Sequence, residues 1–501
     1  MSEGFDVIIV GLGYAGAVAA ISAHDAGARV LLLEKRSEPG GISVCSAGGI
    51  RCGEHPSEML AYLEATNGGT TPKKVLAALA SGMAELPRFI GDLAKAVGAK
   101  ATLRAATGNY PFPGHDAFAF VNIDDVPGFD AGREFPNVRG SPAGARLFKV
   151  MLDNVRLRRI ETRYGAAATG LVLDDGRVKG VRVGRTVVHA RGGMVLATGG
   201  FEGAPDLQRQ FWAMQPVLSA AIRSNTGDGL RLAQSAGAAL WHMWHYHGSY
   251  GFRHPDPAYP FGIRLKRLPD WLPGAPLRED VTMSWILVDR SGRRFMNEYE
   301  PYLQDTGHRS LEPYDFSTLS QPRLPALLIV DAEGRELYPL SAPTWNDAEV
   351  AARFSGHSPR DMDAALLRSF ATLGELARAY NIEPQTLAAT VAAWNELVTT
   401  GAPDPLGRPV KGRAPIGTAP FSAAQVWPIV SNTQGGPMHD ERQRVIDAFG
   451  RPIEGLYEAG EVGSVFGHVY LSGGNLAECC VGGRIAGREA ALAAIGRRAV
   501  A

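Results

Sequence analysis

Hydrophobic residues near the start of the chain follow the pattern of a strand, a tight turn, a helix and a second strand. The apolar run from Val7 to Val10 predicts a buried parallel strand, and the run from Val30 to Leu33 predicts its neighbour. Between them, Gly11, Gly13 and Gly16 mark a turn that leads into a helix. These elements together form a predicted βαβ unit.

The glycine spacing of this unit is typical of a dinucleotide-binding turn. Gly11 permits the tight turn, Gly13 lets a pyrophosphate approach the helix N-terminus, and Gly16 lets helix and strand pack closely. Glu34 closes the second strand, where a carboxylate can accept hydrogen bonds from a ribose 2′-OH. A glycine-rich turn also arises for packing alone. Because strand, spacing and acid agree here, we predict a dinucleotide without a 2′-phosphate.

Further along the chain, the pattern alternates between helices and short strands. Helical periodicity extends from Pro56 to about Leu93. Short strands are expected between Thr162 and Val183, around a hairpin turn that begins at Asp174. A buried strand is expected from Gly192 to Gly200, and a helix from Leu230 to Ala239.

The middle of the chain differs in composition from both ends. Between about Tyr246 and Pro428, Pro, Trp, Tyr and charged residues become frequent. Two amphipathic helices are predicted there, over 362–380 and 384–399. This change in composition indicates a second domain inserted into the first.

From Thr433 onward, glycine-rich segments return, so the nucleotide-binding domain is expected to be completed by the C-terminal part of the chain. We predict an α/β fold. Residues 1–245 and 430–501 form a discontinuous Rossmann-like domain, and residues 246–429 form an inserted α+β domain.

Length and charge exclude several classes of protein. A chain of 501 residues with 45% hydrophobic residues can bury a sizeable core in more than one domain. Lys and Arg together number 51, as do Asp and Glu, so no net field attracts nucleic acid or an anionic membrane. No stretch has about 18 uninterrupted apolar residues. The first strand begins near Asp6, which leaves no room for a signal peptide, so we expect a cytoplasmic protein.

Metal binding and disulfide bonds are not expected. The four cysteines are few for this length and lack CxxC spacing, so we interpret them as reduced. The run Trp241 to His247 is rich in histidine, but no carboxylate or cysteine follows at matching spacing. Aromatic packing explains this run better than a metal site.

Eight segments, spread over nearly the whole chain, resemble one flavoprotein family. They are Gly11 to Gly16, Glu34, Gly40-Gly41, Ala197 to Gly200, Thr226 to Gly229, Arg293 to Glu298, Gly455 to Glu461 and Gly473 to Leu476. In kind and order they resemble the fumarate reductases, succinate dehydrogenase flavoprotein subunits and 3-ketosteroid dehydrogenases. The resemblance implies an FAD-binding domain and a capping domain whose interface holds the active site.

The resemblance also assigns residues to FAD. It implies that Glu34 binds the adenosine ribose, that Asp228 and Glu461 contact the cofactor, and that the helix starting near Asn475 points at the flavin N1–O2 edge. No histidine occupies the loop from Gly40 to Gly49, so we expect FAD to be non-covalent. The positions assigned to the cofactor are Gly11, Gly13, Tyr14, Ala15, Gly16, Glu34, Lys35, Gly41, Ser43, Ala47, Gly48, Gly49, Ala168, Thr198, Gly199, Asp228, Glu461, Asn475 and Leu476.

The substrate residues differ from those of the fumarate reductases. In that branch an arginine after the Arg-Phe-Met-Asn-Glu segment donates a proton, and another before Gly-Gly-Asn clamps a carboxylate. Here those places hold Gln304 or its neighbours, and Leu471-Ser472. The pattern therefore resembles the ketosteroid dehydrogenases more closely.

In that second branch, two hydrogens leave adjacent carbons beside a ring ketone. A tyrosinate takes the α-proton, the β-hydride goes to flavin N5, and hydrogen-bond donors hold the ketone oxygen. By position, Tyr470 and the Gly474 amide would hold the carbonyl, with Ser472 as an additional donor, and Tyr302 would be the base. Tyr110 is either a proton relay or part of the pocket wall. Without the resemblance, Tyr302 would be interpreted as a packing residue.

The sequence therefore predicts an FAD-dependent dehydrogenase or ene-reductase acting on the CH–CH bond beside a ring ketone, either a 3-ketosteroid or a smaller alicyclic ketone. Its expected partners are this small substrate and an external electron acceptor, with no nucleic acid. One alternative is a fumarate-reductase-like 2-enoate reductase with a carboxylate substrate. Another is a flavin electron-transfer subunit without a substrate of its own.

Overall fold

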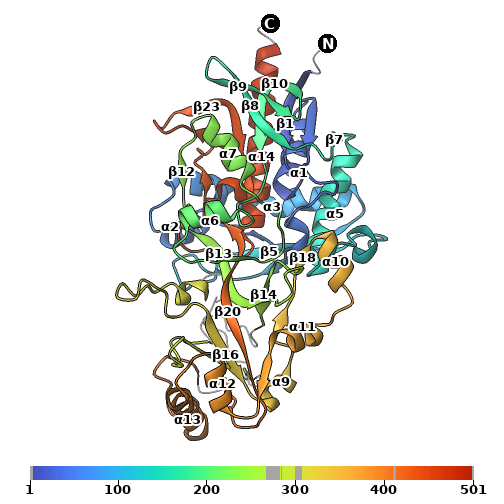
Figure 1. Ribbon diagram of the computed structural model, residues 1–501. Coiled ribbons are helices and arrows are strands. Elements are labelled where there is room, and N and C mark those ends of the chain that lie inside the picture. Colours follow the sequence, from blue (N-terminus) through green and yellow to red (C-terminus); the bar gives the residue numbers. More distant parts are fainter. Residues whose placement is uncertain (1–3, 267–281, 284, 299–306, 410–412, 499–501) are drawn as a thin grey trace. The chain divides into compact units, whose positions relative to one another are not determined.

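The computed structural model describes residues 4–266, 282–283, 285–298, 307–409 and 413–498 (Figure 1). Contacts divide the chain into two compact units: unit 1 comprises 1–212, 222–246 and 432–501, and unit 2 comprises 213–221 and 247–431. The predicted α/β fold, a discontinuous Rossmann-like domain with an inserted α+β domain, is confirmed.

The main sheet of unit 1 has the strand order β22-β23-β10-β1-β2-β7. At its centre β1 (Gly4–Val10) pairs in parallel with β2 (Val30–Leu33) and with β10 (Thr186–Leu196). The apolar runs predicted as buried strands occupy these central positions, because a parallel strand covered on both faces needs apolar residues throughout. The remaining strands are β7 (Glu161–Arg163), β22 (Arg444–Ile446), β23 (Pro452–Glu458) and the predicted hairpin β8 (Ala168–Asp174) and β9 (Arg177–Val183).

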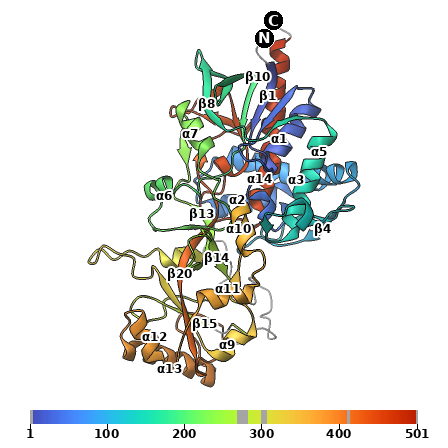
Figure 2. The ribbon, with the colours of Figure 1, turned by 45° about the vertical axis from the view of Figure 1, so that its right-hand side comes forward.

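Two helices far apart in the sequence pack against each other beside this sheet. They are α1 (Tyr14–Asp25) and α14 (Gly474–Arg498), drawn blue and red in Figures 1 and 2. A Cβ atom on Gly487 would lie 2.2 Å from the backbone oxygen of Ala19, so only glycine permits this approach. The C-terminal segment thus completes the N-terminal βαβ unit.

The other elements of unit 1 surround this core. Within the described residues, no helix of either unit is both long and apolar enough to cross a membrane. The elements are η1 (Ser43–Cys45), β3 (Ile50–Cys52), α2 (Pro56–Asn67), α3 (Lys73–Ala96), β4 (Lys100–Ala105), β5 (Ala119–Asp125), α4 (Ala131–Glu134), β6 (Val138–Arg139), α5 (Pro142–Leu157), α6 (Pro205–Phe211), α7 (Asp228–Ser235), β12 (Leu240–Trp241), β21 (Gly436–Pro437) and η3 (Gly460–Gly463).

Unit 2 is built on a mixed sheet with the order β15-β16-β20-β13-β14-β17, and β11 and β19 also pair with β20. Its elements are β11 (Leu218–Ser219), β13 (Tyr246–Arg253), β14 (Gly262–Leu265), β15 (Trp285–Val288), η2 (Gly307–Leu311), β16 (Ala326–Val330), α9 (Ala332–Leu337), β17 (Ser341–Ala342), β18 (Trp345–Asn346), α10 (Ala348–Phe354), α11 (Pro359–Leu366), β19 (Arg368–Phe370), α12 (Leu373–Ala379), α13 (Pro384–Thr400) and β20 (Phe421–Thr433).

Four sequence-based boundaries differ from the structure. The strand expected from Gly192 to Gly200 is β10, which spans Thr186–Leu196, because its first residues pair with β9. The helix predicted over 362–380 is wrong: α11 and α12 are separated by β19, which pairs with β20, and Thr372 caps α12. The helix predicted to reach Ala239 ends at Ser235, because Gly237 has φ +90°. Residues 213–221 group with unit 2, since β11 pairs with Ile429 and Val430 of β20.

Candidate functional site: a dinucleotide pocket in unit 1

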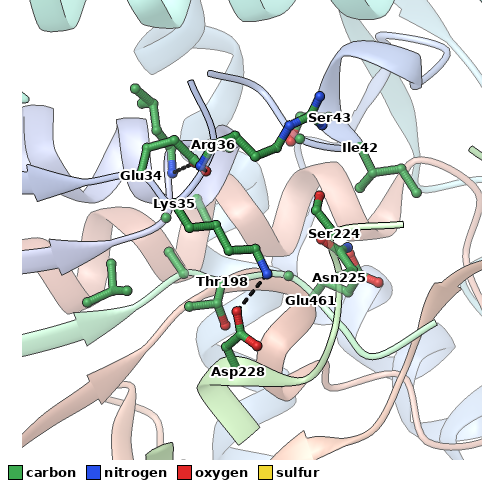
Figure 3. Close-up of a pocket in the computed structure, with 18 of the residues that line it drawn as sticks. Glu34, Lys35, Arg36, Ile42, Ser43, Thr198, Ser224, Asn225, Asp228 and Glu461 are labelled. Carbon is green, nitrogen blue, oxygen red and sulfur yellow. Dashed lines mark hydrogen bonds and ion pairs between the residues drawn. The ribbon is translucent and has the colours of Figure 1, made fainter. Parts of the chain in front are cut away.

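A pocket of about 780 Å³ lies at the carboxyl ends of the central strands of unit 1 (Figure 3). Its walls come from the turn after β1, the end of β2, the segment before η1, the residues after β10, the start of α7, and the segment that contains η3. In open α/β sheets, ligands bind at this edge.

The turn between β1 and α1 presents backbone amides to the pocket. Gly13 precedes α1 and supplies no side-chain cap. Ser43 Oγ accepts a hydrogen bond from Tyr14 N at 3.1 Å, and a Cβ on Gly13 would lie 2.9 Å from that oxygen. Gly11 has φ +105° and lies against the backbone of Ala197. The N-terminal amides of α1 are therefore positioned to bind an anion such as a pyrophosphate.

Glu34 at the end of β2 is fixed by two main-chain donors. Leu12 N donates to its Oε2 at 2.9 Å, and Arg36 N donates to its Oε1 at 2.9 Å (Figure 3). The carboxylate is buried and borders the pocket. Each carboxylate oxygen has a second lone pair, so Glu34 can also accept hydrogen bonds from ribose hydroxyls.

An ion pair in the pocket wall joins the residue after Glu34 to the start of α7. Lys35 Nζ lies 2.6 Å from Asp228 Oδ2 (Figure 3). It also lies 3.1 Å from Thr226 Oγ1. Asp228 begins α7, where a negative charge is favoured by the helix dipole. The two predicted cofactor residues are thus partners of each other and lie on the pocket surface.

Two further polar groups fit a bound dinucleotide. Thr198 Oγ1 is buried in the pocket wall without a hydrogen-bond partner among the described residues. Glu461, in η3, borders the pocket and accepts a hydrogen bond from Thr433 N at 2.9 Å. Unsatisfied buried hydroxyls are rare in proteins, so Thr198 indicates a ligand that supplies its partner.

The structure brings most of the sequence-assigned cofactor residues together in one pocket. Lining it are Gly11, Gly13, Tyr14, Ala15, Glu34, Lys35, Gly41, Ser43, Ala168, Thr198, Gly199, Asp228 and Glu461. The assigned residues that do not line it are Gly16, Ala47, Gly48, Gly49, Asn475 and Leu476. Gly16 instead packs against Gly11. Asn475, the second residue of α14, accepts hydrogen bonds from the side chains of Asn432 and Gln434.

Sequence reasoning missed several residues that line the pocket. Ser224 and Asn225 directly precede the Thr-Gly-Asp-Gly segment, so their proximity could have been anticipated. Cys479 follows Asn475 by four positions, a spacing that places both on one face of a helix. Arg36 carries no such signal beyond its position after Lys35.

At the start of α14, Tyr470 forms part of a tight turn. Its hydroxyl oxygen accepts a hydrogen bond from Gly473 N at 3.1 Å, and its ring packs edge-on against Phe466. The side chain is only 5% exposed. Gly474 N donates to the Leu471 carbonyl at 2.6 Å, so the amide assigned to the substrate is used within the turn in this structure.

A second loop is bound to this turn. Ser472 N donates to Asn109 Oδ1 at 2.7 Å, next to Tyr110. Buried Arg51 donates to the carbonyl oxygens of Ser472 at 2.8 Å and Thr107 at 2.9 Å, and its guanidinium stacks on Phe120. The structure therefore joins the segments that carry Tyr110 and Tyr470. Tyr302, the assigned base, and Gln304 lie outside the described residues.

The histidine-rich run makes structural contacts. His242 stacks on Trp241, and its ring nitrogens bond the Ser464 carbonyl and Thr71 Oγ1. Across the described part of the chain, no three His, Cys, Asp or Glu side chains are grouped as metal ligands.

A dinucleotide pocket in a discontinuous Rossmann-like unit, with an inserted α+β domain, is the arrangement that the sequence resemblance implied. The family model described as an FAD binding domain matches residues 6–476, and the chain belongs to this family. It is thereby an FAD-dependent oxidoreductase related to the fumarate reductases and 3-ketosteroid dehydrogenases.

Individual relatives fall in two branches of this family. The chain is 29% identical to a fumarate reductase (cytochrome) of Shewanella frigidimarina, covering 97% of this chain and 77% of the relative. It is 26% identical to a 3-oxosteroid 1-dehydrogenase of Mycolicibacterium smegmatis, and the match covers 99% of this chain and 98% of the relative.

Among solved structures, the 3-ketosteroid Δ1-dehydrogenase of Sterolibacterium denitrificans matches with a TM-score of 0.79 and 22% identity, covering 98% of this chain and 99% of the other. The open conformation of a flavocytochrome c3 fumarate reductase matches with a TM-score of 0.70 and 24% identity. This match covers 99% of this chain and 79% of the other. These two similarities establish the fold.

Proposed function

We propose that the protein is an FAD-dependent dehydrogenase or ene-reductase that acts on the CH–CH bond beside a ring ketone, with a ketosteroid or a smaller alicyclic ketone as substrate. The observation that carries this proposal is the joining of the Tyr110 and Tyr470 segments through Asn109 and Arg51. It places two phenol-bearing loops together at the start of α14. Ketone chemistry of this kind uses phenols as donor and relay.

The environment of Tyr470 suits a donor to a ketone oxygen. Its hydroxyl oxygen accepts a hydrogen bond from Gly473 N, and a hydroxyl that accepts a hydrogen bond is polarised into a stronger donor. Burial and the packed ring of Phe466 hold the phenol in one orientation. Because Gly474 N is bonded to Leu471 O, Tyr470 is the donor on which the proposal rests.

The remaining roles follow from the chemistry. The α-proton of the ketone would go to the phenolate oxygen of Tyr302, with Tyr110 as relay, while Tyr470 stabilises the developing enolate oxygen. Bound FAD would supply the acceptor for the hydride that leaves the β-carbon. An external electron acceptor is then required to return the enzyme to its oxidised form.

We infer that FAD is held without a covalent bond. Cys479 and Tyr14 line the pocket and are nucleophile candidates there. Burial and the nearby Glu478 charge raise the pKa of the Cys479 thiol well above its ordinary range, and burial raises that of Tyr14. Both groups therefore stay protonated and unreactive at neutral pH.

A 2-enoate reductase with a carboxylate substrate is the second candidate, favoured by the 29% identity to a fumarate reductase. Against it, Leu471 and Ser472 precede the glycine pair where the resemblance implies an arginine. Arg51, the buried guanidinium nearby, donates to two main-chain carbonyls. The ketone substrate is therefore better supported.

Anaerobic bleaching of the flavin absorbance, with a panel of cyclic ketones and a separate panel of enoates, tests the proposal. We expect bleaching by saturated cyclic ketones. Tyr470→Phe should lower turnover by roughly 10²–10³-fold with unchanged FAD content, as loss of an oxyanion donor does. Tyr457→Phe, a buried tyrosine on β23, is the matched control. If reduced enzyme is reoxidised by enoates and no ketone reacts, the carboxylate alternative is correct.

A further inference from the structure

Two buried glutamates meet beside the FAD pocket. Glu461 borders the pocket, and Glu202, which follows β10 in the chain, is 1% exposed. A Cβ atom on Gly200 would lie 2.5 Å from Glu461 Oε1 and 3.0 Å from Glu202 Oε2. Both oxygens therefore lie against Gly200, and the two carboxyl groups, hereafter the carboxyl pair, are close neighbours.

The donors that the structure describes around the carboxyl pair leave one of its oxygens without a partner. Glu461 Oε1 accepts from Thr433 N at 2.9 Å and from Thr433 Oγ1 at 3.5 Å, and Glu202 Oε1 accepts from Asn225 Nδ2 at 2.8 Å. Glu202 Oε2 is buried, and no N–H or hydroxyl of the described residues donates to it. Two carboxylate oxygens are both acceptors, so a hydrogen bond between them requires a proton on one of the groups.

The surrounding charges do not neutralise the carboxyl pair. Lys35 is the nearby cation, but it is already paired with Asp228 at 2.6 Å. The other titratable groups that interact with the pair, Glu478 and Cys479 on α14, carry either negative charge or none. Among the residues that the structure describes, a second negative charge on the pair would therefore have no cation of its own.

The acid–base properties of the pair agree with this geometry. Burial raises the pKa of Glu461 to about 7. Burial and the negative charge of Glu461 raise the pKa of Glu202 well above its ordinary range. Near neutral pH, one proton is therefore retained between the two groups.

We propose that Glu202 is a positioning residue for the cofactor: its protonated carboxyl donates to Glu461 and leaves a Glu461 oxygen to accept a hydrogen bond from a hydroxyl group of FAD. The proposal rests on FAD occupying this pocket and is independent of the substrate. Removing the proton places two negative charges side by side, which pushes the carboxylates apart and withdraws the acceptor from the pocket.

The test is the pH dependence of FAD affinity, measured by fluorescence titration of the full-length apoprotein between about pH 6 and pH 9. Above the pKa of the pair, the dissociation constant of the wild type should rise about tenfold per pH unit. Glu202→Gln should give a nearly constant value, because its amide donates to Glu461 at every pH. Glu458→Gln, at a buried glutamate on β23 that does not border the pocket, should keep the wild-type slope.

If Glu202 had a purely structural role, Glu202→Gln would weaken FAD binding by the same factor at every pH. The proposal is therefore overturned if the FAD dissociation constant of Glu202→Gln depends on pH as steeply as that of the wild type. If this variant does not fold, the wild type alone can test the proposal. Calorimetric titration with FAD, in two buffers of different ionisation enthalpy, measures the number of protons taken up on binding. About one proton should be taken up per FAD above the pKa of the pair. No proton uptake at any pH would also overturn it.

Discussion

Gly16 offers the sharpest test of how the pocket is built. A Cβ atom at this position would lie 1.8 Å from the backbone oxygen of Gly11 and 2.9 Å from its carbonyl carbon. Carbon atoms in contact are normally about 3.5–4 Å apart, and a backbone carbonyl cannot rotate away as a side chain can. The Gly16→Ala variant must therefore open the turn that presents the amides of α1 to the pyrophosphate.

Overpacking of this kind typically costs about 1–3 kcal/mol. The immobile backbone of Gly11 places Gly16→Ala at the upper end of that range. Since the turn must close to bind FAD, a cost of about 2–3 kcal/mol corresponds to a roughly 30- to 150-fold rise in the dissociation constant. Titration of apoprotein with FAD, together with the flavin content of purified protein, measures this effect.

Gly91→Ala is the matched control, because Gly91 also lies in a helix, α3, and a Cβ there would meet nothing within 4 Å. It should leave FAD affinity unchanged and stabilise the protein by up to about 1 kcal/mol, the helix preference of alanine over glycine. If Gly16→Ala binds FAD within about threefold of the wild type, the turn tolerates the extra carbon and the close-approach argument is refuted.

Three further predictions concern the same unit. Glu34→Gln loses one of two acceptors for the Leu12 and Arg36 amides, so FAD affinity in a fluorescence titration should fall by roughly 10- to 100-fold; an unchanged affinity would contradict a role in FAD binding. Acid precipitation should release intact FAD into the supernatant, and a yellow pellet would contradict the non-covalent assignment. Burial raises the pKa of Glu478 from 4.5 to about 8, so the folded state binds more protons there. The free energy of unfolding, measured with urea, should therefore fall as pH rises from 4.5 to about 8, by at most ~1.4 kcal/mol per unit from this group, and Glu478→Gln should reduce that slope.

The first βαβ unit could be predicted closely because its signals are local. The apolar runs fix β1 and β2, and the three glycines fix the turn, within the same short segment. The helix expected over 362–380 failed for the opposite reason. Its periodicity is helical, but residues 368–370 gain more by pairing with β20, and the sequence does not show that a strand edge lies beside them.

In the candidate site too, the sequence predicted what local motifs encode and missed what depends on long-range contacts. Positions such as Glu34 and Asp228 belong to spaced motifs, so their place in the pocket was predictable. Glu202 belongs to no motif, and its role depends on Glu461, which reaches it only through folding. Arg51 likewise gains significance only from the two loops that it joins. Long-range polar contacts of this kind leave no periodic signal in a sequence.

The strand order of unit 1 also determines when the protein can first capture its cofactor. During synthesis, β1, β2 and β10 emerge early, but β10 lacks its partner β23, and α1 lacks α14, until residues 452–498 follow. Unit 2, which ends at residue 431, emerges entirely before them. Until then the unfinished sheet has an open edge, which is prone to wrong pairing. Because Glu461 and Cys479, which line the pocket, are synthesised last, we expect FAD to bind only after the inserted unit has been completed.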